Sequence, residues 1–161
     1  MNFTIRLAEA TDNSALARII RAAFIEFGAP LTGTVYEDPT TDELFGLFEP
    51  IENANLFVAE LEGQVVGCCG IYPTNGLAIG YAELVKFYLA KQARSKGIGK
   101  ALFEKSIDAA KEMNYSHLYI ESQPSFGKAV KMYETYGFKY LNAPLGNSGH
   151  DNCDIWMLKV V

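Results

Sequence analysis

The stretch Arg94-Ser95-Lys96-Gly97-Ile98-Gly99-Lys100 follows a strand-like run, 81–89, and opens a helical pattern that extends from about Gly97 to Met113. Its two glycines let the backbone approach a ligand without interference from a Cβ atom. Successive N–H groups at a helix start, with the positive end of the helix dipole behind them, bind anions. Three cationic side chains add full charges there: Arg94, Lys96 and Lys100. The stretch therefore predicts a site for a phosphate-bearing ligand.

Two other phosphate-binding motifs do not fit this stretch. A P-loop would need glycine where Arg94 stands and serine or threonine where Ala101 stands. A dinucleotide fingerprint would need a third glycine where Leu102 stands. The pattern present is Arg-x-x-Gly-x-Gly between a strand and a helix. The alternative interpretation is a solvated turn in which the glycines make the start of the helix flexible.

A second pattern, Ala-Val-Lys-Met-Tyr-Glu-Thr-Tyr-Gly-Phe, occupies residues 129–138. Its apolar residues recur at helical spacing, Gly137 suits the left-handed position after a helix, and Phe138 begins the next apolar run. Together the two patterns resemble the GNAT superfamily of acyl-CoA-dependent N-acetyltransferases. That family has a [Gln/Arg]-x-x-Gly-x-[Gly/Ala] loop and a later helix ending in Tyr-Glu-x-x-Gly-Phe. The order of elements fits the family over about the last half of the chain.

The resemblance implies acetyl-CoA as acetyl donor, with no metal. Its pyrophosphate is expected against the backbone amides and side chains of the loop: Arg94, Ser95, Lys96, Gly97, Ile98, Gly99 and Lys100. Its pantetheine is expected to pair with the backbone of Phe87 and Leu89, in the manner of an added strand. The resemblance also implies that the strands around Leu89 and Ile120 splay apart to hold it.

Length and composition predict one soluble globular domain over residues 1–161. The chain is 49% hydrophobic and 20% charged, and its net charge of −5 argues against nucleic-acid and anionic-membrane binding. No apolar run approaches the roughly 20 residues that span a bilayer, and the N-terminus lacks the layout of a signal peptide. A cytoplasmic location is therefore expected, and a homodimer is left open. The adjacent Cys68 and Cys69 are expected to be buried thiols.

The expected fold class is α/β (α+β): a mixed, mostly antiparallel sheet with helices on both faces. Strands are expected near 3–7, 56–61, 64–72, 80–89, 117–121, 138–141 and 154–160. A first helix should begin at Thr11 or Asp12, and Thr40 or Thr41 should cap a short helix through Phe48.

Acetyl transfer needs a neutral amine, a stabilised oxyanion and a leaving thiolate. Glu83 is the candidate general base. Strand alternation places it on one face with Val85 and Phe87. An apolar setting there would raise its pKa toward the working range. Its place, six residues before Leu89, also resembles that of the glutamate base in the histone acetyltransferase branch. The alternative is an edge-facing or ion-paired carboxylate.

The resemblance assigns two further roles. The Leu89 N–H, aimed by a bulge in its strand, would stabilise the oxyanion, and the Tyr133 phenol would protonate the thiolate. The alternative for Tyr133 is a core-facing tyrosine. The sequence departs from the family at Phe126, where many relatives carry asparagine; Ser125 is a candidate substitute or a helix cap after Pro124.

The segment Gly149-His150-Asp151-Asn152-Cys153 allows three interpretations. A Cys-His-Asp nucleophile is disfavoured because such groups usually meet across a fold, and a zinc site lacks further ligands at matching spacing. A polar loop with Cys153 packed inside is favoured. Within that loop, the resemblance leaves open that His150 borders the acceptor pocket.

The acceptor is expected to be a small-molecule amine or a peptide amine. The resemblance places the region after the first helix at the acceptor pocket, so its acidic run favours a small cationic amine (Glu37, Asp38, Asp42, Glu43, Glu49 and Glu52). The alternative for this run is a solvated face, and neither fold nor cofactor site specifies a substrate. The rival function is a non-catalytic module that binds or senses acyl-CoA.

Overall fold

Seven strands form one sheet in the computed structural model, which describes residues 2–161. The strand order is β1-β2-β3-β4-β5-β7-β6, and within the described residues β4 and β5 are the one parallel pair. The strands are β1 (Phe3–Leu7), β2 (Asn55–Leu61), β3 (Gln64–Tyr72), β4 (Tyr81–Leu89), β5 (His117–Ser122), β6 (Lys139–Tyr140) and β7 (Ile155–Val160). The predicted mixed, mostly antiparallel sheet is confirmed.

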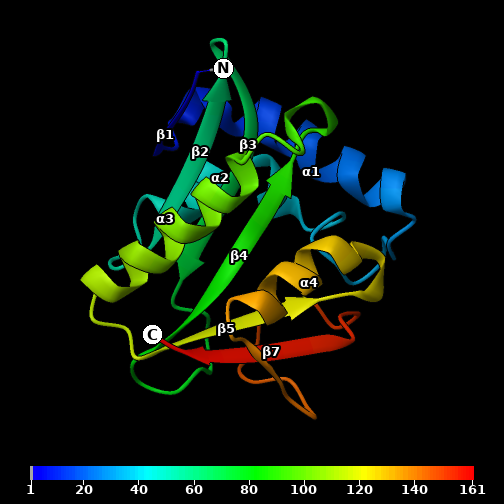
Figure 1. The fold of residues 1–161 in the computed structure, drawn as a ribbon. Coiled ribbons are helices and arrows are strands. Elements are labelled where there is room, and N and C mark those ends of the chain that lie inside the picture. The colour runs from blue at the N-terminus through cyan, green and yellow to red at the C-terminus, as the bar shows by residue number, and fades with distance from the viewer. Residues whose placement is uncertain (1) are drawn as a thin grey trace.

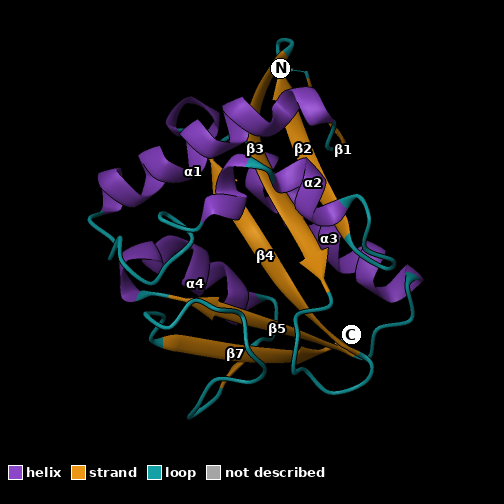
Figure 2. Ribbon diagram, turned by 180° about the vertical axis from the view of Figure 1, so that it is seen from behind, coloured by secondary structure: helices purple, strands orange, loops and turns teal. Residues whose placement is uncertain are grey.

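Helices cover both faces of the sheet, as predicted. They are α1 (Asn13–Phe27), α2 (Leu44–Phe48), α3 (Ile98–Glu112) and α4 (Gly127–Thr135). Figure 1 shows α3 and α4 in front of the sheet, and Figure 2 shows α1 and α2 on the opposite face. Each pair buries its own core, one around Leu102 and Phe103 and the other around Leu16 and Phe24. Burial of these apolar side chains stabilises the layered arrangement.

The sheet opens between β4 and β5. Pairing joins only the first three residues of each strand, Tyr81–Glu83 with His117–Tyr119, although β4 continues to Leu89 and β5 to Ser122. The two strands diverge from their shared end in Figure 1. This divergence confirms the predicted splaying around Leu89 and Ile120 and leaves the last part of β4 without a strand on that side.

A β-bulge in β4 overturns one sequence-based expectation. The register with β3 shifts between Cys68 and Gly70, and Lys86 adopts the left-handed conformation with φ of 56°. The extra residue of a bulge changes which face the following side chains occupy. Val85 therefore packs with the α1 side and Phe87 with the α3 side. The prediction that Glu83 and Val85 share a face with Phe87 was wrong, because alternation holds only in an unbulged strand.

Two predicted helix caps are also wrong. A 3₁₀ turn, Pro39–Asp42, precedes α2, and its cap is Asp38, which accepts the Thr40 N–H at 2.9 Å. A second 3₁₀ turn, Pro124–Phe126, displaces Ser125 from the cap position, and α4 begins only at Gly127. In both segments proline at the first position starts a tighter turn before the α-helix. Among residues 2–161, no helix combines the length and hydropathy needed to cross a membrane.

Candidate active site

Two cavities meet at the end of β4. The loop cavity, about 380 Å³, lies between α1, α4 and the segment 94–100. The inner cavity, about 330 Å³, lies on the α1 and α2 side and reaches the loop 147–153. Four residues line both cavities: Phe87, Tyr88, Phe126 and Ala129. A ligand in one cavity can therefore contact a ligand in the other.

The loop cavity is built around a left-handed turn at the start of α3. Ser95 and Gly97 have φ values of 60° and 80°, and α3 begins at Ile98. A Cβ atom at Gly99 would lie 2.8 Å from Leu89 Cδ1, so this glycine lets the helix start against the end of β4. The predicted anion site at a helix N-terminus thus opens onto a cavity.

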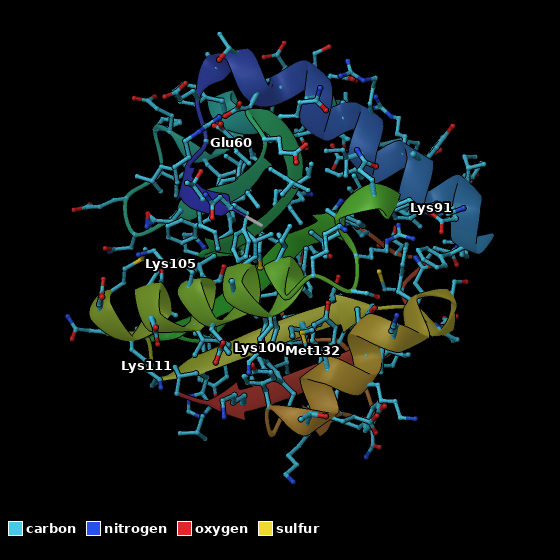
Figure 3. The ribbon with its side chains drawn as sticks, turned by 45° about the horizontal axis from the view of Figure 1, so that its top comes forward. Glu60, Lys91, Lys100, Lys105, Lys111 and Met132 are labelled. Atoms are coloured by element: carbon cyan, nitrogen blue, oxygen red, sulfur yellow. The ribbon has the colours of Figure 1, made fainter. Side chains whose placement is uncertain are left out.

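The structure brings most of the predicted cofactor residues together around the loop cavity. Seven of them line it: Phe87, Leu89, Arg94, Ser95, Gly97, Gly99 and Lys100. The Ile98 side chain is instead fully buried in the core, which leaves only its backbone for a ligand, and Lys96 is exposed outside the lining. Figure 3 shows Lys100 and Met132 at the facing surfaces of α3 and α4, with Lys91 apart from them beside α1.

Arg94 has a structural role in addition to its charge. Its guanidinium donates to Glu26 Oε2 at 2.6 Å and to the Leu89 carbonyl at 3.1 Å, and it lies 4.8 Å from the centre of the Phe27 ring. These contacts hold the C-terminal part of α1 against the loop, so Arg94 closes one wall of the loop cavity.

The Leu89 N–H faces the open slot between the diverging strands. Ala90 N–H donates to the Val66 carbonyl at 2.7 Å. Backbone groups of successive strand residues point to opposite edges, so the Leu89 N–H points away from β3. The β5 strand does not pair with β4 beyond Glu83. The Leu89 N–H is therefore directed into the slot, away from β3, and its predicted role as oxyanion donor stays a prediction.

The family's asparagine position is filled by an aromatic side chain. The Phe126 ring makes edge contacts with the rings of Phe24 and Phe27, whose centroids lie 5.1 and 5.9 Å away. It supplies apolar surface where both cavities meet and no polar contact. Ser125 lines the loop cavity nearby.

Glu83 is buried at the inner cavity. It is 5% exposed, and its Oε1 accepts a hydrogen bond from Thr74 Oγ1 at 2.6 Å. Burial, and next the nearby charge of Glu121, raise the pKa of Glu83 from 4.5 to about 7. Within residues 2–161 it forms no ion pair. Glu83 is therefore a buried carboxylate without an ion pair in the described part of the chain, and both alternatives, an edge-facing and an ion-paired carboxylate, are excluded.

This environment predicts a pH-dependent stability difference between wild type and Glu83→Gln. The folded-state pKa of about 7 lies above the unfolded value of 4.5, so the wild-type free energy of unfolding is fully retained below pH 4.5. The wild-type free energy of unfolding should then fall by about 3 kcal/mol, relative to that of the variant, as pH rises through 7. Urea unfolding from pH 4.5 to 8 measures the difference, with Glu112→Gln as an exposed control. A difference that does not change with pH would contradict the burial argument.

Tyr133 is both a core residue and a cavity residue. It is 5% exposed, stacks on Phe103 with ring centroids 5.6 Å apart, and lines the inner cavity. Burial raises the pKa of its phenol, which keeps the O–H protonated. No hydrogen bond joins that phenol to another group of residues 2–161. The phenol thus remains a donor available to a ligand.

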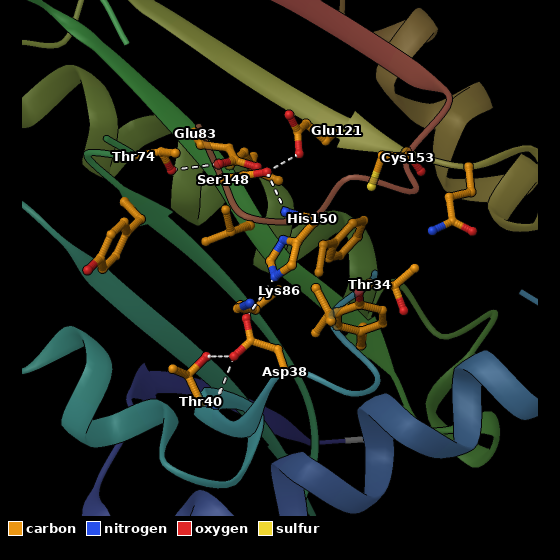
Figure 4. Close-up of a pocket in the computed structure, with 18 of the residues that line it drawn as sticks. Thr34, Asp38, Thr40, Thr74, Glu83, Lys86, Glu121, Ser148, His150 and Cys153 are labelled. Carbon is orange, nitrogen blue, oxygen red and sulfur yellow. Dashed lines mark hydrogen bonds and ion pairs between the residues drawn. The ribbon is translucent and has the colours of Figure 1, made fainter. Parts of the chain in front are cut away.

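The segment 149–153 forms the predicted polar loop, and His150, whose position was left open, lines the inner cavity together with Cys153. His150 Nε2 lies 2.8 Å from Asp38 Oδ2 rather than beside Cys153 (Figure 4). Burial raises the pKa of the Cys153 thiol to about 11, which disfavours the nucleophilic thiolate. No group of three or more potential metal ligands occurs among residues 2–161.

The acidic run does not form a patch at the cavity. Of its six members only Asp38 lines the inner cavity. The Glu37 carboxylate accepts the Gly33 N–H at 2.7 Å, and Asp42 pairs with Arg21 at 2.6 Å. One member of the run, Asp38, thus faces the inner cavity, and the cationic acceptor stays a prediction.

The polar residues of the inner cavity that were not predicted from sequence include Thr74, Lys86 and Glu121. Glu121 accepts hydrogen bonds from Tyr119 and Ser148 and lies near Glu83. No local motif marks them, because they come from three segments that meet only in the folded chain. Placing Glu121 beside Glu83 would have required the parallel register of β4 and β5.

Comparisons with known proteins agree with this geometry. The profile of the acetyltransferase (GNAT) family matches residues 18–138. The uncharacterized N-acetyltransferase YjgM of Escherichia coli K12 is 36% identical over 149 residues, covering 92% of this chain and 89% of that protein.

Solved structures share the fold. A GNAT-family acetyltransferase from Staphylococcus aureus Mu50 superposes with a TM-score of 0.86 at 20% identity, covering 99% of both chains. YncA, a putative acetyltransferase of Salmonella typhimurium solved with acetyl-CoA, has a TM-score of 0.75 at 20% identity and covers 99% of this chain and 94% of that one. With its family profile, its fold and its paired cavities, the chain belongs to the GNAT family of acetyltransferases and is an acyltransferase enzyme.

Proposed function

We propose that this protein transfers the acetyl group of acetyl-CoA directly to an amine within a ternary complex. The observation that carries the proposal is the meeting of two cavities at the end of β4. One contains a glycine-rich anion site and the other contains a buried carboxylate with a pKa of about 7. The YncA structure contains acetyl-CoA, which supports the same donor here. A cytoplasmic location and a homodimer stay predictions.

The loop cavity fits the donor chemically. Backbone N–H groups from Ser95 to Lys100 and the ammonium of Lys100 would hold the pyrophosphate. The absent Cβ of Gly99 leaves room for close approach of the ligand. The backbone from Phe87 to Leu89, which has no strand partner on the slot side, would pair with pantetheine.

Each step of the transfer has a residue suited to it. Glu83 takes a proton from the amine, whose nitrogen forms the new C–N bond as the C–S bond breaks. The Leu89 N–H stabilises negative charge that develops on the carbonyl oxygen. The electron pair of the broken bond stays on sulfur, and the Tyr133 phenol donates a hydrogen bond or a proton to that thiolate. The proton held by Glu83 then passes through water to the thiolate, or to Tyr133 where the phenol has given up its own, so the enzyme is restored without being acylated.

Replacement of Tyr133 by phenylalanine tests the leaving-group role. We expect kcat to fall by about 10- to 100-fold, the lower part of the range for general acid catalysis. The affinity for acetyl-CoA should change little, because the contact strengthens only as the thiolate forms. Steady-state kinetics and calorimetric titration measure the two quantities. Unchanged kcat in the folded variant would remove Tyr133 from the mechanism.

The proposal is tested by thiol release from acetyl-CoA across a panel of small amines, amino acids and peptides. The expected result is amine-dependent thiol release accompanied by an acetylated acceptor in the mass spectrum. The rival function, a module that senses acyl-CoA, predicts cofactor binding with no turnover across the panel.

A further inference from the structure

Lys86 is a buried cation that no protein group neutralises directly. It is 8% exposed, although lysine is rarely buried without a partner. It lines the inner cavity, yet no ion pair or side-chain hydrogen bond joins its ammonium to any of residues 2–161. Burial lowers its pKa, whereas Asp38 and Glu83 act in the opposite direction. A buried charge of this kind is destabilising unless a partner compensates it.

The neighbouring carboxylates already have partners. Asp38 Oδ1 accepts from Thr40 N and Oγ1 at 2.9 and 2.7 Å, while its Oδ2 lies 2.8 Å from His150 Nε2. Figure 4 shows Lys86 beside this Asp38–His150 pair, with Glu83 and Glu121 farther along the same cavity. Glu83 is bonded to Thr74, and Glu121 to Ser148 at 2.5 Å. Asp38 and Glu83 therefore act on the Lys86 ammonium only from beyond ion-pair distance, and within residues 2–161 no carboxylate forms a direct ion pair with it.

The bulge in β4 determines where the Lys86 ammonium lies. The left-handed backbone at this residue directs a lysine from the middle of a central strand into the cavity that also holds Glu83. The Lys86 carbonyl accepts from the buried Cys68 thiol at 3.0 Å, which fixes the strand there. The cavity thus has an ammonium near the base that would deprotonate the acceptor.

We propose that Lys86 binds a carboxylate of the acceptor, so that the preferred substrates are amines carrying a carboxylate, of the amino-acid class. This inference rests on the proposed acetyltransferase function and concerns its acceptor side only. The acceptor amine would face Glu83, and its carboxylate would supply the anion that Lys86 lacks. The cavity volume of about 330 Å³ suits a molecule of this size.

The test compares each amino acid with its own carboxamide in the thiol-release assay at pH 8. A hydrogen bond to a charged group contributes about 1.5–3 kcal/mol, so we expect kcat/KM to favour the acid by roughly 10- to 100-fold. The carboxamide's amine is less basic and more of it is neutral, which biases the comparison against the proposal. Lys86→Met should lower the acid-to-amide ratio to one or below, because the amide's larger neutral fraction then remains without the compensating contact. Lys91→Met, which removes an exposed ammonium outside both cavities, should keep the wild-type ratio.

The outcomes separate this inference from the proposed function. Turnover of carboxamides or plain amines as fast as of acids, or an unchanged preference in folded Lys86→Met, would overturn the carboxylate site and leave the acetyltransferase standing. The wild-type comparison decides the matter even if the variant does not fold. Absence of turnover with every amine would overturn both.

Discussion

Gly99→Glu is expected to raise the dissociation constant of acetyl-CoA by at least about 100-fold. The new Cβ would meet Leu89 at 2.8 Å, and the rest of the side chain would enter the loop cavity. A carboxylate there also repels the pyrophosphate, and a like charge beside a bound charge weakens binding by several kcal/mol. Isothermal titration with acetyl-CoA measures the change.

Two matched variants separate this effect from damage to the fold. Gly99→Ala adds only the Cβ, whose neighbour is the flexible end of the Leu89 side chain, and should weaken binding far less. Lys91→Glu places a carboxylate on the exposed turn Lys91–Ala93, outside the loop cavity, and should leave binding nearly unchanged. If a folded Gly99→Glu protein bound acetyl-CoA as tightly as wild type, the loop assignment would be wrong.

Glu83→Gln is expected to lower kcat/KM near neutral pH by about 10²- to 10⁴-fold, the range for loss of a general base. The wild-type rate should rise with pH through the Glu83 pKa of about 7, because only the ionised carboxylate accepts a proton. In the variant this rise should be lost, and the deficit should shrink at higher pH as the amine loses its proton unaided. Rate–pH profiles from pH 5.5 to 9.5 measure both features.

Glu112→Gln is the matched control, since this exposed carboxylate at the end of α3 lies outside both cavities and should keep the wild-type profile. A Glu83→Gln enzyme with the wild-type profile would exclude Glu83 as the base.

The sequence predicted the parts of the site that depend on local patterns. The loop 94–100 is recognisable because glycine, cationic residues and a helix start must be contiguous to bind phosphate. Tyr133 was identified through its place in the second family pattern, and Glu83 through its place in the strand 81–89, six residues before Leu89. The structure places both at the inner cavity, whereas their chemical roles stay predictions.

The sequence did not predict features that depend on contacts between distant segments. The resemblance implied a bulge in the strand of Leu89 but not its place at Lys86, which follows from the register of β3 and β4. The bulge moved Phe87 to the opposite face and directed a lysine into the cavity. Charge counted along the chain likewise does not show which members of the acidic run face the cavity: Asp38 does, whereas Asp42 pairs with Arg21 on a separate helix.

The central claim is direct transfer between ligands held in two adjoining cavities, and initial rates with both substrates varied test it most directly. A ternary-complex mechanism predicts double-reciprocal lines that intersect, with no acetylated protein in the intact mass spectrum. Parallel lines, together with a stable acetyl group on Cys153 or Lys86, would show that the enzyme itself carries the acetyl group and would contradict the account.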